Sequence, residues 1–263
     1  MTIPLYAVDA FACERFRGNP AAICFCPSNA PDNWMQQIAA EMNLSETSFL
    51  VPYENGIWGL RWFTPAAEVP LCGHATLAAA HILWETKRIP AGEPIHFSTK
   101  SGLLTCRNSA SGIVMDFPAR TLESGNPPDG MAHALGCDFR WAGRTGADWL
   151  LEVAHAGVVR GLRPDFGALA HLPFRAVTVT ARSDTPEYDF VSRFFAPSLG
   201  VPEDPVTGSA HCTLASYWSP LVGKLRMRAW QASSRGGEVG VELAGNRVYL
   251  TGTAITVWRG ELA

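Results

Sequence analysis

The side chain in this sequence best placed to move protons is a glutamate. Glu46 lies between a segment with helical periodicity and the strongly apolar run at residues 47–51. A carboxyl group among apolar neighbours tends to have a raised pKa, which suits it to proton transfer near neutral pH. The competing interpretation is an exposed glutamate in a cap or strand, which composition alone favours because most glutamates are exposed.

Two glycines are the second chemical signal, because each opens an alanine-rich apolar run. Gly73 follows Cys72, and Gly208 follows Thr207. The first turn of a helix has unpaired N–H groups and partial positive charge, so two such starts could hold a carboxylate or an enolate. The alternative is that both glycines only allow close helix packing. Their matched positions in two similar halves favour the site.

Three further polar residues flank these helix starts. His74 could bind substrate or help move a proton, or it could be a core histidine bonded to a carbonyl group. Asp204 precedes the second start and could act on substrate or simply cap a turn. Ser209 could donate to a ligand or satisfy the first helical turn. The candidate catalytic residues are therefore Glu46, His74 and Asp204.

The chain repeats itself, which indicates how these residues are positioned. The segment 61–65 (RWFTP) recurs at 193–197 (RFFAP), 132 positions later (193 − 61), and the Val-Pro pair at 69–70 recurs at 201–202. On this offset Cys72 aligns with Asp204. Such a repeat predicts two lobes related by an approximate twofold, with a cleft between them. Arg61 and Arg193 recur and are interpreted as scaffold residues that anchor each strand.

The expected fold class is α+β, with two pseudo-symmetric, β-barrel-like lobes, each wrapped around a central helix. Hydrophobic periodicity and turn signals predict the elements of both lobes. Strands are expected over 5–8, 20–25, 47–51, 60–63, 150–153, 176–180, 190–195 and 254–258, with hairpins over 102–117 and 239–250. Helices are expected from 31, 73, 164 and 208. The first lobe comprises residues 1–117, a Pro-rich linker 118–130, and the second lobe 131–253, while the strand at 254–263 returns to the first lobe.

Composition excludes several classes of protein. The net charge is −3, apolar residues are 47% and charged residues 17%, so neither nucleic acid nor membrane is an expected partner. Seven scattered cysteines and an N-terminus without a basic region predict a soluble cytoplasmic protein. The histidines and cysteines lack zinc spacing, and nucleotide-binding loops are missing, so neither metal nor cofactor is expected.

The chain resembles the PhzF-like family of phenazine biosynthesis, within the diaminopimelate-epimerase-like fold. The stretches that carry the resemblance are 9–11, 18–21, 41–47, 61–65, 68–74 and 203–210. It implies a homodimeric, cofactor-independent isomerase that acts on a small molecule in a site between the lobes. It also implies that Glu46 is the acid/base. The family's helix-start glycine and histidine match Gly73 and His74.

The family's aspartate and Gly-Ser pair match Asp204, Gly208 and Ser209. We add Asn19 and Ser45 as polar groups expected to contact the substrate, together with Cys72. The expected reaction moves a proton, and with it a double bond, on a small carboxylate-bearing substrate.

Two other functions stay open. Epimerases of the wider fold use one thiol from each half, and Cys72 could serve an amino- or hydroxy-acid epimerase or racemase together with Glu46 or Asp204. Cys212, about a turn into the second helix, does not restore a thiol pair. The third possibility is a non-catalytic module that binds a small molecule or a protein on the same scaffold.

Overall fold

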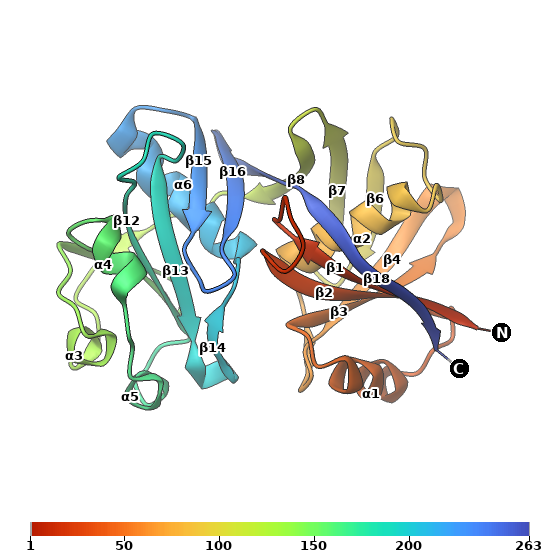
Figure 1. Ribbon diagram of the computed structural model, residues 1–263, viewed down its shortest axis with the longest axis horizontal. Helices are drawn as coiled ribbons and strands as arrows, with labels where there is room; N and C mark the ends of the chain where they lie inside the picture. Colours follow the sequence, from red (N-terminus) through yellow and green to blue (C-terminus); the bar gives the residue numbers. More distant parts are fainter. Residues whose placement is uncertain (1, 263) are drawn as a thin grey trace. The chain divides into compact units, whose positions relative to one another are not determined.

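Strand β1 (Ile3–Ala10) pairs in antiparallel fashion with β2 (Asn19–Phe25) on one side and with β18 (Ala254–Leu262) on the other. The computed structural model describes residues 2–262. The chain divides into two units: residues 1–117 with 250–263 form unit 1, and residues 118–249 form unit 2. Unit 1 is therefore built from both ends of the sequence (Figure 1).

Neighbouring strands of unit 1 pair alternately in parallel and antiparallel fashion as far as β6. β2 and β3 are parallel, β3 and β4 antiparallel, β4 and β6 parallel, and β6, β7 and β8 form an antiparallel meander. The short β5 pairs with the end of β4. The bounds are β3 Glu46–Pro52, β4 Ile57–Phe63, β5 Glu68–Val69, β6 Ile95–Thr99, β7 Gly102–Ser109 and β8 Gly112–Pro118.

Unit 2 repeats this scheme strand for strand. β10 and β11 are antiparallel, β11 and β12 parallel, β12 and β13 antiparallel, β13 and β15 parallel, and β15 and β16 antiparallel. The short β14 pairs with β13 as β5 pairs with β4. The bounds are β9 Glu123–Ser124, β10 Trp141–Thr145, β11 Asp148–Glu152, β12 Ala176–Arg182, β13 Phe190–Ala196, β14 Val201–Asp204, β15 Arg226–Gln231 and β16 Gly237–Ala244. Strand β17 (Arg247–Gly252) begins in unit 2 and ends in unit 1. The duplication expected from the repeated segments is thus visible in the topology.

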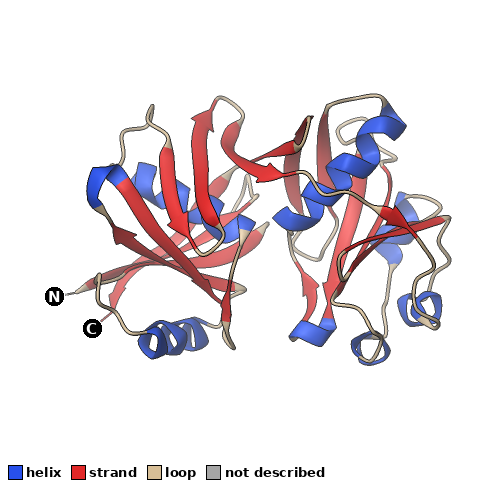
Figure 2. Ribbon diagram, turned by 180° about the vertical axis from the view of Figure 1, so that it is seen from behind, coloured by secondary structure: helices blue, strands red, loops and turns tan. Residues whose placement is uncertain are grey.

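Each unit contains one long helix that runs among its strands (Figure 2). In unit 1 this helix is α2 (Gly73–Glu85), which contacts β1, β2 and β3. Its residues are apolar on nearly every side, as a helix surrounded by strands requires. In unit 2 it is α6 (Gly208–Val222), which contacts β15 and β16 and ends at Gly223, where φ is 68°. That left-handed conformation suits glycine.

The remaining helices are short or lie outside the sheet. α1 (Asp32–Met42) packs Met35, Ile38 and Ala39 against β3, where they form a core cluster with Phe49. The others are α3 Met131–Leu135, α4 Ala156–Gly161, α5 Phe166–Ala170 and the 3₁₀ turns η1 Glu54–Gly56 and η2 Pro197–Leu199. Within the described residues 2–262, no helix combines the length and apolar character needed to span a bilayer.

The segment 118–130, expected as a linker, carries β9, which pairs with β10 through Ser124 opposite Gly143. It therefore falls within unit 2. The sequence patterns also gave no sign of β6, β10, β15, α3 or α4. The arginine-rich β15 (Arg226–Gln231) has only alternate buried residues, so no apolar run marks it.

Candidate active site

Glu46 is positioned by the alternation of side chains along β3. Ser48, two residues further on, donates from its hydroxyl to the Ala75 carbonyl oxygen of α2 at 3.1 Å, so this face of β3 looks toward the helix. Phe49, on the opposite face, packs with α1. Because residues i and i+2 share a face, the Glu46 side chain lies on the α2 side, at the end of β3 where the helix begins.

Asn19 begins the neighbouring strand and lies near Glu46 because β2 and β3 run parallel. Ala21 lies opposite Glu46 in this pairing, so Asn19 and Glu46 occupy the same ends of their strands. The preceding Gly18 has φ 64°, and a Cβ atom there would lie 2.1 Å from the Ala10 carbonyl oxygen. Glycine is thus required for the turn that delivers Asn19 to the site.

The first turn of α2 supplies His74, which is 4% exposed. Its Nε2 lies 3.0 Å from Glu46 Oε2, and its Nδ1 lies 3.1 Å from Asn19 Nδ2. Because an amide nitrogen can only donate, Nδ1 of the neutral ring accepts, and the ring proton lies on Nε2, on the Glu46 side. A protonated ring would instead donate from Nδ1 to the oxygen of a turned Asn19 amide.

Cys72 completes this group at the N-cap of α2. Its Sγ lies 3.5 Å from His74 Nδ1 and 3.9 Å from Nε2. The structure therefore brings Asn19, Glu46, Cys72 and His74 together, all within unit 1. Ser45 is half-buried beside Glu46, and Gly73 lies between the thiol and the imidazole.

Burial and charge act in opposite directions on the His74 ring. Burial favours its neutral form, but the adjacent Cys72 and Glu46 outweigh this and hold the pKa of His74 well above its ordinary value. For Cys72, burial and then the charge of Glu46 raise the pKa of the thiol to about 11. The sulfur is therefore a thiol at neutral pH, and it is buried, whereas the Glu46 side chain is 17% exposed.

Unit 2 carries the other predicted residues around the start of α6. The half-buried Asp204 accepts a hydrogen bond from the Thr207 hydroxyl at 2.5 Å. Gln231, fully buried on β15, accepts from the Thr207 N–H at 2.8 Å and donates to the Asp204 carbonyl oxygen at 2.7 Å. Gly208 and Ser209 follow as the first two residues of the helix.

The offset of 132 positions between the repeated segments does not hold at the starts of the two central helices. The N-caps are Cys72 and Thr207, which are 135 positions apart (207 − 72), so Thr207 and not Asp204 is the counterpart of Cys72. The expected alignment of Cys72 with Asp204 is therefore wrong, because unit 2 has three extra residues between the repeated Val-Pro pair and its central helix (203–207 against 71–72). Aligning the two glycines instead of the two strands would have identified Thr207, whereas Gln231 gave no signal in the sequence.

Arg61 and Arg193 are scaffold residues, as the repeat suggested. Arg61 donates from Nε and Nη2 to the two carboxylate oxygens of Glu68, both at 2.8 Å. Arg193 makes the same forked contact with Glu203, at 2.7 and 2.8 Å. Each pair holds a short strand, β5 or β14, against its neighbour just before the central helix begins.

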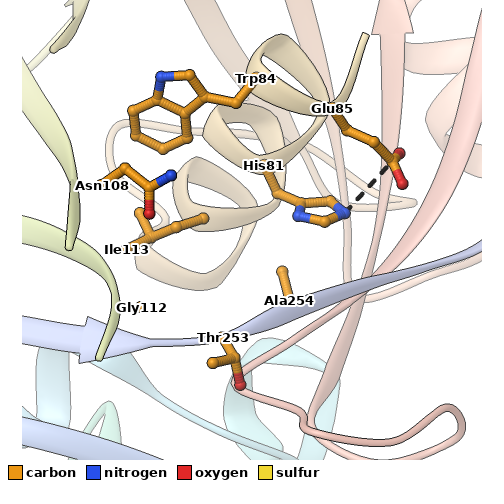
Figure 3. Close-up of a pocket in the computed structure, with 8 residues that line it drawn as sticks. All are labelled: His81, Trp84, Glu85, Asn108, Gly112, Ile113, Thr253 and Ala254. Carbon is orange, nitrogen blue, oxygen red and sulfur yellow. Dashed lines mark ion pairs between the residues drawn. The ribbon is translucent and has the colours of Figure 1, made fainter. Parts of the chain in front are cut away.

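A hollow of about 390 Å³ lies elsewhere on unit 1, near the other end of α2 (Figure 3). It is lined by His81, Trp84, Glu85, Asn108, Gly112, Ile113, Thr253 and Ala254. His81 Nε2 lies 3.9 Å from Glu85 and 3.0 Å from the Thr256 hydroxyl. None of the predicted site residues lines this hollow.

Known proteins share both the sequence and the fold of this chain. A family model described as phenazine biosynthesis-like protein, PhzC-PhzF, matches residues 8–260. An uncharacterized isomerase of Halalkalibacterium halodurans is 49% identical over 263 residues, covering 100% of this chain and 99% of that protein. The crystal structure of a PhzF-family phenazine biosynthesis protein from Enterococcus faecalis superposes with a TM-score of 0.95 and 41% identity, covering 100% of both chains.

A more distant structure, a predicted epimerase of Pseudomonas aeruginosa, has a TM-score of 0.77 at 24% identity and covers 98% of each chain, which shows the fold alone. The duplicated α+β architecture is thus of the diaminopimelate-epimerase-like class. Within that class, the chain belongs to the PhzF-like family, and the resemblance seen in its motifs is confirmed.

Proposed function

We propose that this protein is a cofactor-independent isomerase that moves a proton, and with it a double bond, on a small carboxylate-bearing substrate. Membership of the PhzF-like family and a relative named as an isomerase support isomerase or epimerase chemistry at this general level. The observation that carries the finer proposal is the 3.0 Å contact between Glu46 Oε2 and His74 Nε2 in a mostly buried group.

In the proposed reaction, Glu46 exchanges one proton with two carbon atoms of the same substrate. Its carboxylate takes a proton from a carbon next to a double bond, and the C–H electron pair becomes part of a delocalised anion. The protonated Glu46 then returns the proton to the far carbon of this system. One C–H bond breaks and another forms, the double bond shifts by one position, and the formula is unchanged.

The surroundings of Glu46 support this role. Its Oε2 atom is among the buried polar atoms without a hydrogen bond in the described residues, although His74 Nε2 is within ion-pair distance. The oxygen thus retains lone pairs that can receive a substrate proton. A positioned carboxylate of this kind typically contributes about 10²–10⁴-fold to the rate.

The other predicted residues are assigned binding roles. In unit 1 we assign His74 to substrate binding and polarisation, and the first N–H groups of α2 to the negative charge that develops on the substrate. For Asp204 and the first N–H groups of α6, in unit 2, the same assignment stays a prediction from the sequence. Ser209 and Ser45 are proposed as hydrogen-bond donors. The ordered contacts of Asp204 with Thr207 support its assignment, because a fixed carboxylate orients a ligand better than a mobile one.

The test begins with a panel of small unsaturated carboxylic acids, screened by thermal shift. Each acid that stabilises the protein is incubated with it in D₂O and followed by proton NMR. Wild-type protein is expected to exchange or shift a C–H proton, and Glu46→Gln to do so about 10²–10⁴-fold more slowly. The control is Glu41→Gln, an exposed glutamate of α1, which is expected to match wild type.

Near wild-type exchange by Glu46→Gln would remove this residue from the mechanism. Binding by several acids without exchange in any of them would instead support the non-catalytic module.

A second candidate is an amino- or hydroxy-acid epimerase that uses Cys72, favoured by the contact of its Sγ with the His74 ring. The raised pKa of Cys72, about 11, opposes it, because a base must be deprotonated to remove a proton. Inactivation by iodoacetamide at neutral pH that substrate prevents would support the epimerase. Unchanged activity of Cys72→Ala would exclude it.

A further inference from the structure

The side chains of Glu46, Cys72 and His74 offer an oxygen, a sulfur and a nitrogen atom that all lie within 4.8 Å of one another. His74 Nε2 is 3.0 Å from Glu46 Oε2 and 3.9 Å from Cys72 Sγ. Zinc bonds of about 2.0–2.3 Å place neighbouring ligand atoms of a tetrahedral site roughly 3.3–3.6 Å apart. The three atoms therefore need shifts of about 1 Å or less to surround one ion, since no pair of them is more than 4.8 Å apart.

From this geometry we propose that Glu46, Cys72 and His74 bind a thiophilic divalent cation such as Zn²⁺. Sulfur, imidazole nitrogen and carboxylate oxygen are all ligands that zinc accepts in proteins. The three residues come from the start of β3 and the first turn of α2, so the spacing rules used for zinc motifs in a sequence do not reveal the site. This cation site goes beyond the proposed isomerase reaction.

The bound state is balanced in charge. A thiolate and a carboxylate together neutralise a divalent cation, so the occupied site carries no net charge although it is mostly buried. On binding, the Cys72 thiol releases its proton to solvent, since a coordinated thiol is deprotonated.

His74 can serve such an ion without a change of backbone. The ring would bind through Nε2 and carry its proton on Nδ1, where Asn19 is in contact at 3.1 Å. An asparagine side chain can present either its nitrogen or its oxygen, so a turn of the amide provides the acceptor that Nδ1 then needs. Partners of this kind orient metal-bound histidines and contribute about 10–100-fold to affinity.

The bound ion would inhibit the proposed isomerase. It would occupy the Glu46 oxygen that must receive the substrate proton and would also hold the His74 ring in one tautomer. Inhibition depends on the proposed function, but binding does not. An optical measurement of binding therefore separates failure of this proposal from failure of the isomerase assignment.

The probe is Co²⁺, which takes zinc sites and gives a thiolate-to-metal charge-transfer absorption when a cysteine is bound. Wild-type protein is expected to show this band with one Co²⁺ per chain and to lose it when Zn²⁺ is added. Cys72→Ser should abolish the band, and Glu46→Gln should keep it with an affinity lowered at least tenfold. Cys13→Ser removes an exposed thiol outside the site and should behave like wild type.

The result that would overturn the proposal is a band that survives in Cys72→Ser or disappears in Cys13→Ser, or no band at all in wild type. Far-ultraviolet circular dichroism of each variant confirms its fold. Glu46→Gln nearly preserves the shape of the side chain and is expected to fold. If Cys72→Ser does not fold, the test therefore uses Glu46→Gln alone. In that case an affinity for Co²⁺ equal to wild type would refute the site.

Discussion

Cys72 and Glu46 lie beside the same imidazole ring but differ in readiness for chemistry at neutral pH. The thiol is 7% exposed and belongs to the start of a buried helix, whereas the Glu46 side chain is 17% exposed. Burial penalises a thiolate more than any neighbour compensates, so the sulfur keeps its proton. The difference favours the carboxylate as the group that exchanges protons with a substrate.

This difference predicts a pattern of cysteine labelling. With a pKa of about 11, roughly one Cys72 side chain in 10⁴ is a thiolate at pH 7, and only the thiolate reacts. Iodoacetamide should therefore modify the exposed Cys13 first and leave Cys72 unmodified. Raising the pH should speed Cys72 labelling about tenfold per unit while the protein stays folded. Peptide mass spectrometry after timed quenching measures both rates, and faster labelling of Cys72 at pH 7 would contradict the raised pKa.

At the scale of elements, the connection from β14 to α6 depends on one buried side chain. Gln231 accepts a hydrogen bond from the Thr207 N–H and donates one to the Asp204 carbonyl oxygen. Because it comes from β15, it fixes the helix start against a strand distant in sequence. We therefore regard Gln231 as a residue that positions Asp204.

Replacing Gln231 with Leu should destabilise the protein by about 2 kcal/mol, since the buried Thr207 N–H and the half-buried Asp204 carbonyl oxygen lose their bonds to this side chain. Urea denaturation measures this change in the free energy of unfolding. Gln37→Leu, on α1, changes the same residue type at an exposed position and should alter stability by less than about 0.5 kcal/mol. Equal effects of the two substitutions would show that Gln231 is not needed at the helix start.

His211, in the first turns of α6, makes this helix sensitive to acid. Its Nδ1 donates to the Thr207 carbonyl oxygen at 2.8 Å, and burial lowers the pKa of the ring from 6.5 to about 4. Between these pH values the His211 ring is protonated in the unfolded chain but stays neutral in the folded chain. The contribution of His211 to the free energy of unfolding is therefore fully present above about pH 6.5 and is lost as the pH falls toward 4.

The expected loss from this group is about 3 kcal/mol over the pH range 6.5 to 4. His211→Gln lacks the titration, so its unfolding free energy should fall less steeply than that of wild type in this range. Urea denaturation at pH 7, 6, 5 and 4 provides the comparison. Parallel curves for the two proteins would show that His211 titrates normally in the fold.

The sequence predicts those features that arise from local patterns and misses those that depend on contacts between distant residues. Both central helices, β3 and the hairpins were predictable because apolar runs and turn residues are local features. The grouping of Asn19 with His74 was predicted only as membership of one site, since their contact arises from the parallel pairing of β2 with β3. The role of Gln231 could not be predicted, because its partners lie 24 and 27 positions away in sequence.

At the scale of the whole molecule, duplication gives two versions of one scaffold whose environments differ. The Arg193 side chain is 9% exposed and also donates to the Leu162 carbonyl oxygen at 2.9 Å, whereas the Arg61 side chain is 29% exposed. The arginine of the forked ion pair is thus more deeply buried in unit 2, whereas the two glutamates are buried to a similar degree. Removal of one partner from a buried pair leaves the other charge without compensation.

The duplicated arginines therefore allow a matched comparison between the units. Arg193→Met should cost about 3–5 kcal/mol, because it leaves Glu203 largely buried without its cation. Arg61→Met should cost less, about 1–2 kcal/mol, since Lys100 still pairs with Glu68. Urea denaturation of both variants tests the order, and a larger loss for Arg61→Met would contradict it.

The pairing of β1 with β18 has a consequence during synthesis on the ribosome. Ile3 lies opposite Leu262, so β1 waits for a partner that is translated about 250 residues later. At about 5–20 residues per second this wait is on the order of 10–50 seconds, during which an unpaired edge is available to other nascent chains. The continuous second unit can finish first, so the unit that bears Glu46 completes its sheet only after β18 has been translated.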